Sequence, residues 1–355
     1  MKVKDDSKIT FRLNGIFEYF LAYHMSQDDD FKDLILNEDS IYLSFKNEME
    51  IYSGIKNSDS DFLEFIYNKT KRYFKSVNEG FRNQGTPDEN LQIIISQDHE
   101  IKLSNIVKSI KAINPLNNED QDLIKDDFDP VSINSSIAKK RIYNPSDMDS
   151  EIYERYISVL ARVYKTMDGI NDEQILNEIL DFLLETYINF SFYLSDELDN
   201  NSKDSNNDKE SLLDLINKFL PFISQITFSD SIANYNVEGI ILNKIRELKR
   251  DHKSNQYKLF ILYFILMDID EANIIKYADE LLPLMSIGIL RYTSLMKLSY
   301  YFAFNGNKNA KLAEFLRNRI ESAQINLDGN IDRNKLKQSL DKKKNLLNFN
   351  NRLRR

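Results

Sequence analysis

The sequence predicts an all-α protein, an irregular α-solenoid-like array of helical hairpins with a short strand remnant at the N-terminus. Three observations support this prediction. The 355 residues include only nine Gly and six Pro, and so few helix breakers favour long helices over many short strands. Apolar residues recur at the 3.6-residue period along most of the chain. The helices come in pairs about every 30 to 40 residues, as in stacked-hairpin proteins, although no residue signature repeats.

The N-terminal third begins with the strand-like letters ITF at residues 9–11, followed by Gly15 as a turn and a helix over 16–25. Apolar stripes predict two further helices, over 40–55 and 59–81. The stripe residues are Ile41, Phe45, Met49 and Tyr52 in the first and Phe62, Phe65, Ile66, Tyr73 and Val77 in the second. Residues 83–146 hold four prolines and the β-like letters LQIII at 91–95, so we expect an irregular connecting region.

Regular helices resume after Ser146, a candidate N-cap. The first helix ends at a turn around Gly169, and Asn171 or Asp172 caps a longer one. Residues 199–208 contain no apolar residue, which predicts a solvated loop. We expect further helices at 209–226, 236–251, 254–268, 270–280, 283–304, 308–323 and 331–350. The predicted segments are therefore 1–82, the end of one module with a first helical bundle, then the connector 83–146, and the helical array 147–355.

Composition indicates a folded cytoplasmic protein. Hydrophobic residues make up 42% and charged residues 29% of the chain, which is typical of a packed domain. The absence of Cys fits a reducing compartment. The N-terminal residues lack the apolar core of a secretory signal, and the longest apolar run, 259–267, is far shorter than the roughly 20 residues of a membrane span.

Charge is distributed unevenly. Residues 332–355 hold nine Lys or Arg against two Asp, a net +7, so the rest of the chain carries −16. An acidic body argues against general nucleic-acid binding. The basic tail could contact an anionic partner, or it could be a solvated helix end. The residues that would make such a contact are Lys342, Lys343, Lys344, Arg352, Arg354 and Arg355.

Motifs for catalysis and for cofactors are missing, and we expect no catalytic residue, no cofactor and no metal site. No Gly precedes Lys and no Gly-x-Gly occurs, so the chain lacks a phosphate-binding P-loop. His24, His99 and His252 are isolated, whereas zinc sites group their ligands closely. The acidic runs at 28–30 and 126–129 fit solvated loops or helix N-termini better than calcium loops. An enzyme with an unrecognised site remains the weakest of the alternatives.

Aromatic residues are abundant, with 19 Tyr and 22 Phe. The stretches 73–81, 187–194 and 298–304 could form stacking platforms for bases or peptides. Their helical spacing favours a place in the core, with tyrosine hydroxyls reaching solvent.

Residues 11–22, FRLNGIFEYFLA, resemble the segment that closes the winged-helix module in bacterial NACHT-type STAND P-loop NTPases. In that family a strand ends there, and an aromatic helix starts the helical repeats beyond the ATPase. The motif residues that match are Phe11, Glu18, Tyr19, Phe20 and Ala22, with Ile16 in the apolar slot. Glu18 is then a helix-start or packing residue. The family's histidine falls on Leu13, which cannot donate a hydrogen bond, and Arg12 is a candidate to contact phosphate in its place.

The resemblance implies that this chain is the C-terminal helical sensor part of a larger signalling ATPase, or a separately made piece of one. Bacterial members of this kind look like defence proteins that detect phage, bind a protein ligand and release autoinhibition. The first hypothesis is therefore a non-catalytic sensor or scaffold whose partner is a protein ligand or the rest of its own ATPase. The rival is a stand-alone helical protein that binds nucleic acid or another anionic partner through its basic tail.

Overall fold

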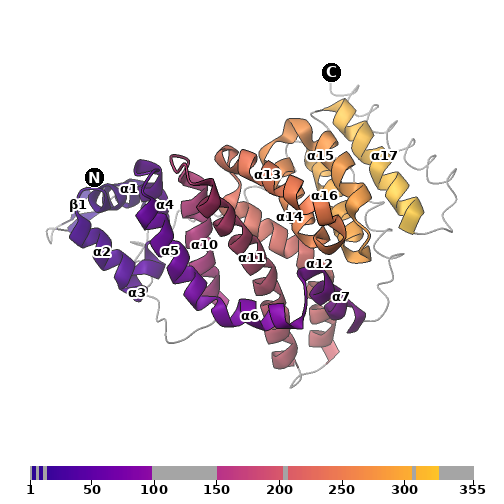
Figure 1. Ribbon diagram of the computed structural model, residues 1–355, viewed down its shortest axis with the longest axis horizontal. Helices are drawn as coiled ribbons and strands as arrows, with labels where there is room; N and C mark the ends of the chain where they lie inside the picture. Colours follow the sequence, from indigo (N-terminus) through magenta and orange to yellow (C-terminus); the bar gives the residue numbers. More distant parts are fainter. Residues whose placement is uncertain are drawn as a thin grey trace. The chain divides into compact units, whose positions relative to one another are not determined.

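The computed structural model describes residues 2–4, 8–10, 14–97, 150–202, 207–305 and 309–327. Apart from one two-stranded hairpin, the elements of this part are helices, which confirms the predicted all-α class (Figure 1). They divide into two compact units, one within Met1–Ile94 and Ile133–Glu271 and the other within Ile95–Ser132 and Ala272–Arg355. Most of 83–146 lies outside the described residues, so the expected segments 1–82, 83–146 and 147–355 stay a prediction.

The strand remnant is an antiparallel hairpin of β1 (Lys2–Lys4) and β2 (Lys8–Thr10), in which Val3 is opposite Ile9. The strand predicted at 9–11 is therefore confirmed for residues 9 and 10, and residue 11 lies outside the described residues. Gly15 was expected to form a turn, but it is the second residue of a helix that begins at Asn14. Nothing surrounds the Cα of Gly15 closely, and a helix tolerates Gly near its first residue at low cost.

Residues 14–97 form seven helices. They are α1 (Asn14–Met25), α2 (Asp29–Asn37), α3 (Asp39–Ser44), α4 (Lys46–Ile55), α5 (Ser60–Tyr73), α6 (Lys75–Gln84) and α7 (Pro87–Gln97). Side-chain caps explain two of the starts: Asp28 accepts from the N–H of Phe31 at 3.0 Å, and Asp59 from that of Phe62 at 3.1 Å.

Two predicted long helices are each broken in two. The helix expected over 40–55 breaks at Phe45, and the helix expected over 59–81 breaks at Phe74. Phe74 is fully buried, and its ring lies 5.2 Å from that of Tyr153 and 6.1 Å from that of Phe190, between centroids. The break lets this ring enter the core while the chain changes direction. No Gly or Pro marks either break, so periodicity alone could not reveal them.

Helix α7 corrects the β-like interpretation of 91–95. Thr86 and Glu89 form a capping box: the N–H of Thr86 donates to Glu89 Oε2 at 2.8 Å, and the N–H of Glu89 donates to Thr86 Oγ1 at 3.3 Å. Pro87 occupies the first helical position, which suits proline. Gly85 has a φ of 152°, and an added Cβ would lie 2.9 Å from Glu89 Oε2. Glycine is therefore required where the chain turns into α7.

The middle of the chain continues with α10 (Ser150–Thr166), α11 (Glu173–Ser202), α12 (Asn207–Ile232), η1 (Tyr235–Val237), α13 (Glu238–Leu248), η2 (Lys249–Ser254), α14 (Gln256–Ile269) and η3 (Glu271–Asn273). Asp172 caps α11 as expected, because its Oδ1 accepts from the N–H groups of Gln174 and Ile175. Of the loop expected at 199–208, residues 199–202 and 207–208 are helical, since α11 ends at Ser202 and α12 begins at Asn207, and residues 203–206 lie outside the described part. Its polar residues are weak helix formers, but none is Gly or Pro.

The second unit contains α15 (Ile274–Leu281), η4 (Leu282–Leu284), α16 (Gly288–Asn305) and α17 (Ala310–Leu327). Helices α16 and α17 pack as a hairpin, and α15 packs against α17. Arg319 of α17 donates to the carboxylate of Asp279 in α15. Six of the seven helices expected after residue 208 are present with shifted ends, and the seventh, at 331–350, lies outside the described residues.

Two hairpins are stacked in register. The first is α4 followed by α5 and α6, and the second is α10 followed by α11 (Figure 1). Hydrogen bonds join residues that are 111 apart in the sequence, in three pairs along the stack: Asn57 with Asp168, Tyr67 with Glu178, and Asn78 with Asn189. A constant offset means that corresponding positions of the two hairpins face one another, as in a solenoid.

The turns of these hairpins touch at Gly169. Its N–H donates to the carbonyl oxygen of Asn57 at 3.2 Å, and a Cβ at this position would lie only 2.8 Å from the Asn57 side chain. The same Cβ would lie 3.1 Å from the Asn57 carbonyl oxygen, so a larger residue at 169 would force Asn57 to move.

Helices α10 and α14 contribute much of the buried core of the first unit. Helix α10 packs against α3, α4, α5, α11 and α12. In α14, all residues except Lys258 and Asp268 are buried. A helix buried around its whole circumference shows no amphipathic period, which explains the uninterrupted apolar run at 259–267.

Asn78 tests the register of the stack. Its Nδ2 donates to Thr186 Oγ1 at 2.9 Å, and its Oδ1 accepts from Asn189 Nδ2 at 3.0 Å, all within the core. Replacing Asn78 by Leu leaves these two partners buried without hydrogen bonds, so we expect the free energy of unfolding to fall by about 1–3 kcal/mol. Urea unfolding measures this loss. Asn68→Leu, on the exposed face of α5, is the control, and an equal effect of both variants would contradict the assignment.

Helix α14 is capped by a residue from α7. The carboxylate of Asp88 accepts from the N–H of Gln256 at 2.8 Å and from that of Tyr257 at 2.9 Å. Burial raises the pKa of Asp88 above its ordinary 3.8, although these two N–H groups act in the opposite direction. The sequence separation of 168 residues makes this cap a purely tertiary contact.

The raised pKa of Asp88 predicts a pH effect on stability. At pH values between the pKa of Asp88 in the unfolded state and its higher pKa in the folded state, the folded state binds more protons. The contribution of this carboxyl to the free energy of unfolding therefore falls as the pH rises through the folded-state pKa. The amide of Asp88→Asn does not titrate. The free energy of unfolding of the wild type, minus that of the variant, should therefore decrease from about pH 4 to about pH 7. Urea unfolding at several pH values measures the difference, and a constant difference would contradict the prediction.

Candidate functional site

Helix α1, which carries most of the family motif, has two opposite faces. Ala22 is fully buried and Met25 is 1% exposed, on the face that packs against α4. The other face is made of large apolar side chains that are all at least 40% exposed. They are Ile16, Phe17, Tyr19, Phe20 and Tyr23, and we call this set the α1 aromatic face. The ring of Tyr19 stacks on that of Tyr23 at a centroid distance of 6.5 Å.

The motif residue Glu18 lies at the edge between these faces. It is half-buried, and its Oε1 accepts a hydrogen bond from Asn47 Nδ2 of α4 at 3.0 Å. Glu18 therefore helps to fix α1 on α4. The matched motif residues divide accordingly: Ala22 and Glu18 hold the helix in place, and Tyr19 and Phe20 are presented to solvent.

The other sequence-predicted contacts fall outside the described residues. These are Phe11 and Arg12, before α1, and the tail residues Lys342, Lys343, Lys344, Arg352, Arg354 and Arg355. A phosphate contact by Arg12 and an anionic partner for the tail therefore stay predictions.

The acidic run at 28–30 is a helix start, as its capping by Asp28 shows. His24 Nε2 lies 3.6 Å from Asp28 Oδ2, and its ring stacks on that of Phe31 at 4.6 Å. Over the described residues no group of three or more His, Asp or Glu is arranged to hold a metal ion. In the same part of the chain no helix is long and apolar enough to cross a membrane.

A cluster of ionisable groups that the sequence did not reveal joins α3, α5 and α10. Lys69 Nζ lies 2.6 Å from Asp39 Oδ1, and Tyr73 donates to Asp39 Oδ2 at 2.6 Å. The ring of Tyr156 stacks on that of Tyr73 at 3.9 Å. Burial alone would raise the pKa of Asp39, but hydrogen bonds from Lys69 and Tyr73 outweigh it and lower that pKa. The Lys69 side chain is only 8% exposed, so this cluster is structural.

The aromatic stretches belong mostly to the core. Phe74, Phe81, Tyr187, Phe192 and Tyr301 are buried, as their helical spacing predicts. Tyr300 is the exception in the third stretch, with 47% of its surface exposed.

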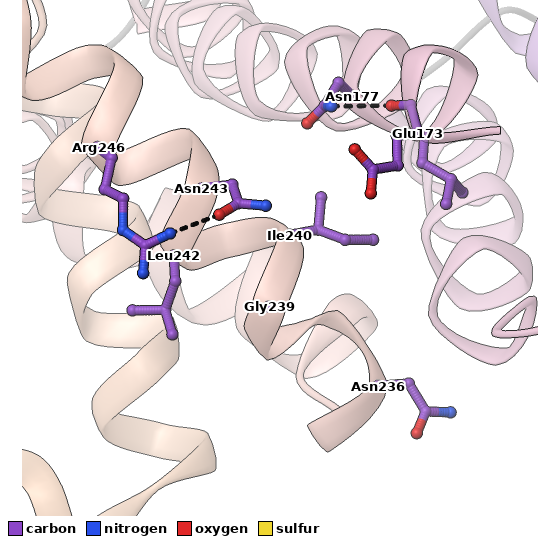
Figure 2. A pocket seen from close by; sticks show the side chains of 9 residues that line it. Glu173, Asn177, Asn236, Gly239, Ile240, Leu242, Asn243 and Arg246 are labelled. Carbon is purple, nitrogen blue, oxygen red and sulfur yellow. Dashed lines mark hydrogen bonds between the residues drawn. The ribbon is translucent and has the colours of Figure 1, made fainter. Parts of the chain in front are cut away.

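A groove lies between the first turns of α11 and the length of α13 (Figure 2). Its volume is about 370 Å³, at the lower end of the range for ligand pockets. One wall is the start of α11, with Glu173, Leu176 and Asn177. The other wall is a single face of η1 and α13, made of residues at helical spacing: Asn236, Gly239, Ile240, Leu242, Asn243 and Arg246.

The hydrogen bonds of the groove leave defined polar atoms facing it. Asn177 Nδ2 donates to the carbonyl oxygen of Glu173 at 2.8 Å, which leaves Asn177 Oδ1 as an acceptor. Arg246 Nη1 donates to Asn243 Oδ1 at 2.7 Å, which leaves Asn243 Nδ2 as a donor. Figure 2 shows Glu173 and Asn177 on one side and Ile240 and Asn243 on the other. Sequence reasoning missed this groove, because its two walls are about 60 residues apart.

Comparison of the chain with protein-family models, with curated proteins and with solved structures found no match. The relationship to NACHT-type STAND NTPases therefore rests on residues 11–22 and stays a prediction.

Ala22 tests the division of α1 into two faces. An added side chain at this fully buried position overpacks the contact with α4, so we expect Ala22→Leu to lower the free energy of unfolding by about 1–3 kcal/mol. Tyr19→Ser, on the exposed face, should change it by no more than about 0.5 kcal/mol. Chemical denaturation of both variants checks the difference. Equal losses would show that α1 has no preferred buried face.

Proposed function

We propose that this chain is the non-catalytic sensor or scaffold part of a STAND-type signalling NTPase, acting in bacterial, anti-phage defence in the cytoplasm. The observation that carries this proposal is the α1 aromatic face, which contains Ile16, Tyr19 and Phe20 of the motif that resembles the ATPase-to-sensor junction. The partner of this face is a protein surface, namely the ATPase-bearing part of the same system.

Exposed aromatic side chains on a fixed helix suit protein recognition. Tyr and Phe are enriched in the cores of protein interfaces, where a few of them supply most of the binding energy. A single exposed apolar residue needs no explanation, but five on one face of one helix form a contiguous patch. The tie from Glu18 to Asn47 and the burial of Ala22 keep this patch in a defined orientation.

The stacked hairpins supply the scaffold. In such arrays each hairpin contacts its neighbours, and the surfaces between hairpins are available to ligands. Autoinhibition then works as an equilibrium between two states: the ATPase is held on the α1 aromatic face in one, and a ligand of the array favours the other.

Gene context gives the first test. A reading frame upstream of, or next to, the one encoding this chain should contain a Gly-Lys-Ser/Thr loop. The ATPase segment so identified is then co-expressed with the chain, and the pair is purified by a tag on the ATPase. We expect Tyr19→Ser/Phe20→Ser to weaken retention at least about tenfold, since aromatic anchors cost about 2 kcal/mol or more each. Asn68→Ala should have no effect.

The outcomes separate this proposal from its rival. A start at Met1 with no ATPase encoded nearby, or retention unchanged by the double variant, would contradict the sensor proposal. Binding to duplex DNA at about 0.15 M salt that disappears on truncation before Asp332 would favour the nucleic-acid alternative.

A further inference from the structure

We propose that the groove between α11 and α13 binds an extended peptide segment that carries a basic side chain. The proposal names a ligand class for the sensor array and in that sense rests on the proposed function. It uses residues of α11 and α13 only, so it can be tested without the α1 aromatic face.

The polar atoms of the groove complement a peptide group. Asn243 offers an N–H donor on one wall and Asn177 an oxygen acceptor on the other. In an extended chain the C=O and N–H groups point sideways in opposite directions. A peptide lying along the groove therefore presents a carbonyl to Asn243 and an amide to Asn177. The hydrogen bond that the other side-chain atom of each asparagine makes within its own helix holds it in this orientation.

The spacing along η1 and α13 suits several residues of such a chain. Asn236, in η1, and Asn243, in α13, are seven residues apart, roughly 11 Å along the helix axis. Three residues of an extended peptide span about 10 Å. A carboxamide at each end can then bond to the same peptide backbone, with Ile240 between them as an aliphatic contact.

Gly239 leaves room for a ligand backbone. It is exposed, lines the groove, and has nothing within 4 Å of the position of a Cβ. The fold itself does not require glycine there, because no neighbour occupies that space. A glycine on this wall lets another main chain approach the helix closely.

Charge at the groove selects the side chain of the ligand. The Glu173 carboxylate points toward the groove (Figure 2), and it forms no ion pair with any described residue. It therefore favours Lys or Arg on the peptide. A sugar or a base is a poorer match, since no aromatic ring lines the groove for stacking, and a nucleic-acid backbone would meet only one cation, Arg246.

The groove is held in shape by ion pairs of one buried lysine with two partly exposed carboxylates. Lys244 Nζ lies 2.7 Å from Asp181 Oδ2 and 2.9 Å from Glu247 Oε2, and its side chain is 4% exposed. Asp181 is about two turns along α11 from Glu173. The contact of Lys244 with Asp181 joins α13 to α11 beside the groove. The two walls are therefore in place before a ligand binds, and binding carries no cost for ordering them.

The experiment measures fluorescence polarisation of labelled, acetylated and amidated hexapeptide pools with the full chain. One pool fixes Lys at a central position among degenerate uncharged residues, and the matched pool fixes Asp. We expect the Lys pool to bind several-fold more tightly, and Asn243→Leu and Asn177→Leu each to weaken binding about fivefold. Asn68→Leu, an exposed helical asparagine away from the groove, should bind as the wild type does.

Two further variants exclude a merely structural effect. Gly239→Leu should abolish binding of the Lys pool without lowering the free energy of unfolding, because leucine is the better helix former. Glu173→Lys should reverse the preference from the Lys pool to the Asp pool. No saturable binding of either pool, an unchanged preference in Glu173→Lys, or full binding by Gly239→Leu would each overturn the proposal. Because these variants leave α1 intact, their failure is distinguishable from failure of ATPase retention.

Discussion

The structure of the first unit depends on the burial of α10 between the hairpin that precedes it and the helices that follow. This helix packs against α3, α4, α5, α11 and α12, and all its buried side chains except Ser158 are apolar or aromatic. Apolar burial supplies the driving force, but it does not fix how far one hairpin slides along the next. Three hydrogen-bonded pairs with an offset of 111 residues mark that register, and the buried pair of Asn78 with Asn189 fixes it, since a shift would leave these two amides unsatisfied in the core.

The position of α1 at the start of this stack explains its composition. It packs mainly on α4, with a smaller contact to α2, whereas α10 is covered by five helices. Its remaining aromatic face is therefore exposed, although the sequence of α1 is as apolar as that of a core helix. The large apolar residues of α1 are typical of a core helix in the sequence, but in the folded chain they are exposed and form a candidate contact surface.

The groove between α11 and α13 depends on polar ties outside it. The ion pair of Lys244 with Asp181 and the cap of Asp172 on α11 fix the two walls, and none of these three residues lines the groove. The proposed sensor therefore combines two separate surfaces, the α1 aromatic face and the polar groove, on one stack of hairpins whose register is fixed by hydrogen bonds.

The sequence by itself determined the helical class, most helix positions, a cap at Asn171 or Asp172 and the core role of most aromatic residues, because these follow from local propensity and from the 3.6-residue period. The capping box at 86–89 was also a local signal, and it outweighs the β-like letters that follow it. Only the tertiary structure decided the breaks at Phe45 and Phe74, the cap of α14 by Asp88, the exposed face of α1 and the groove. Each of these depends on residues distant in the sequence that meet through packing, and local pattern carries no record of such contacts.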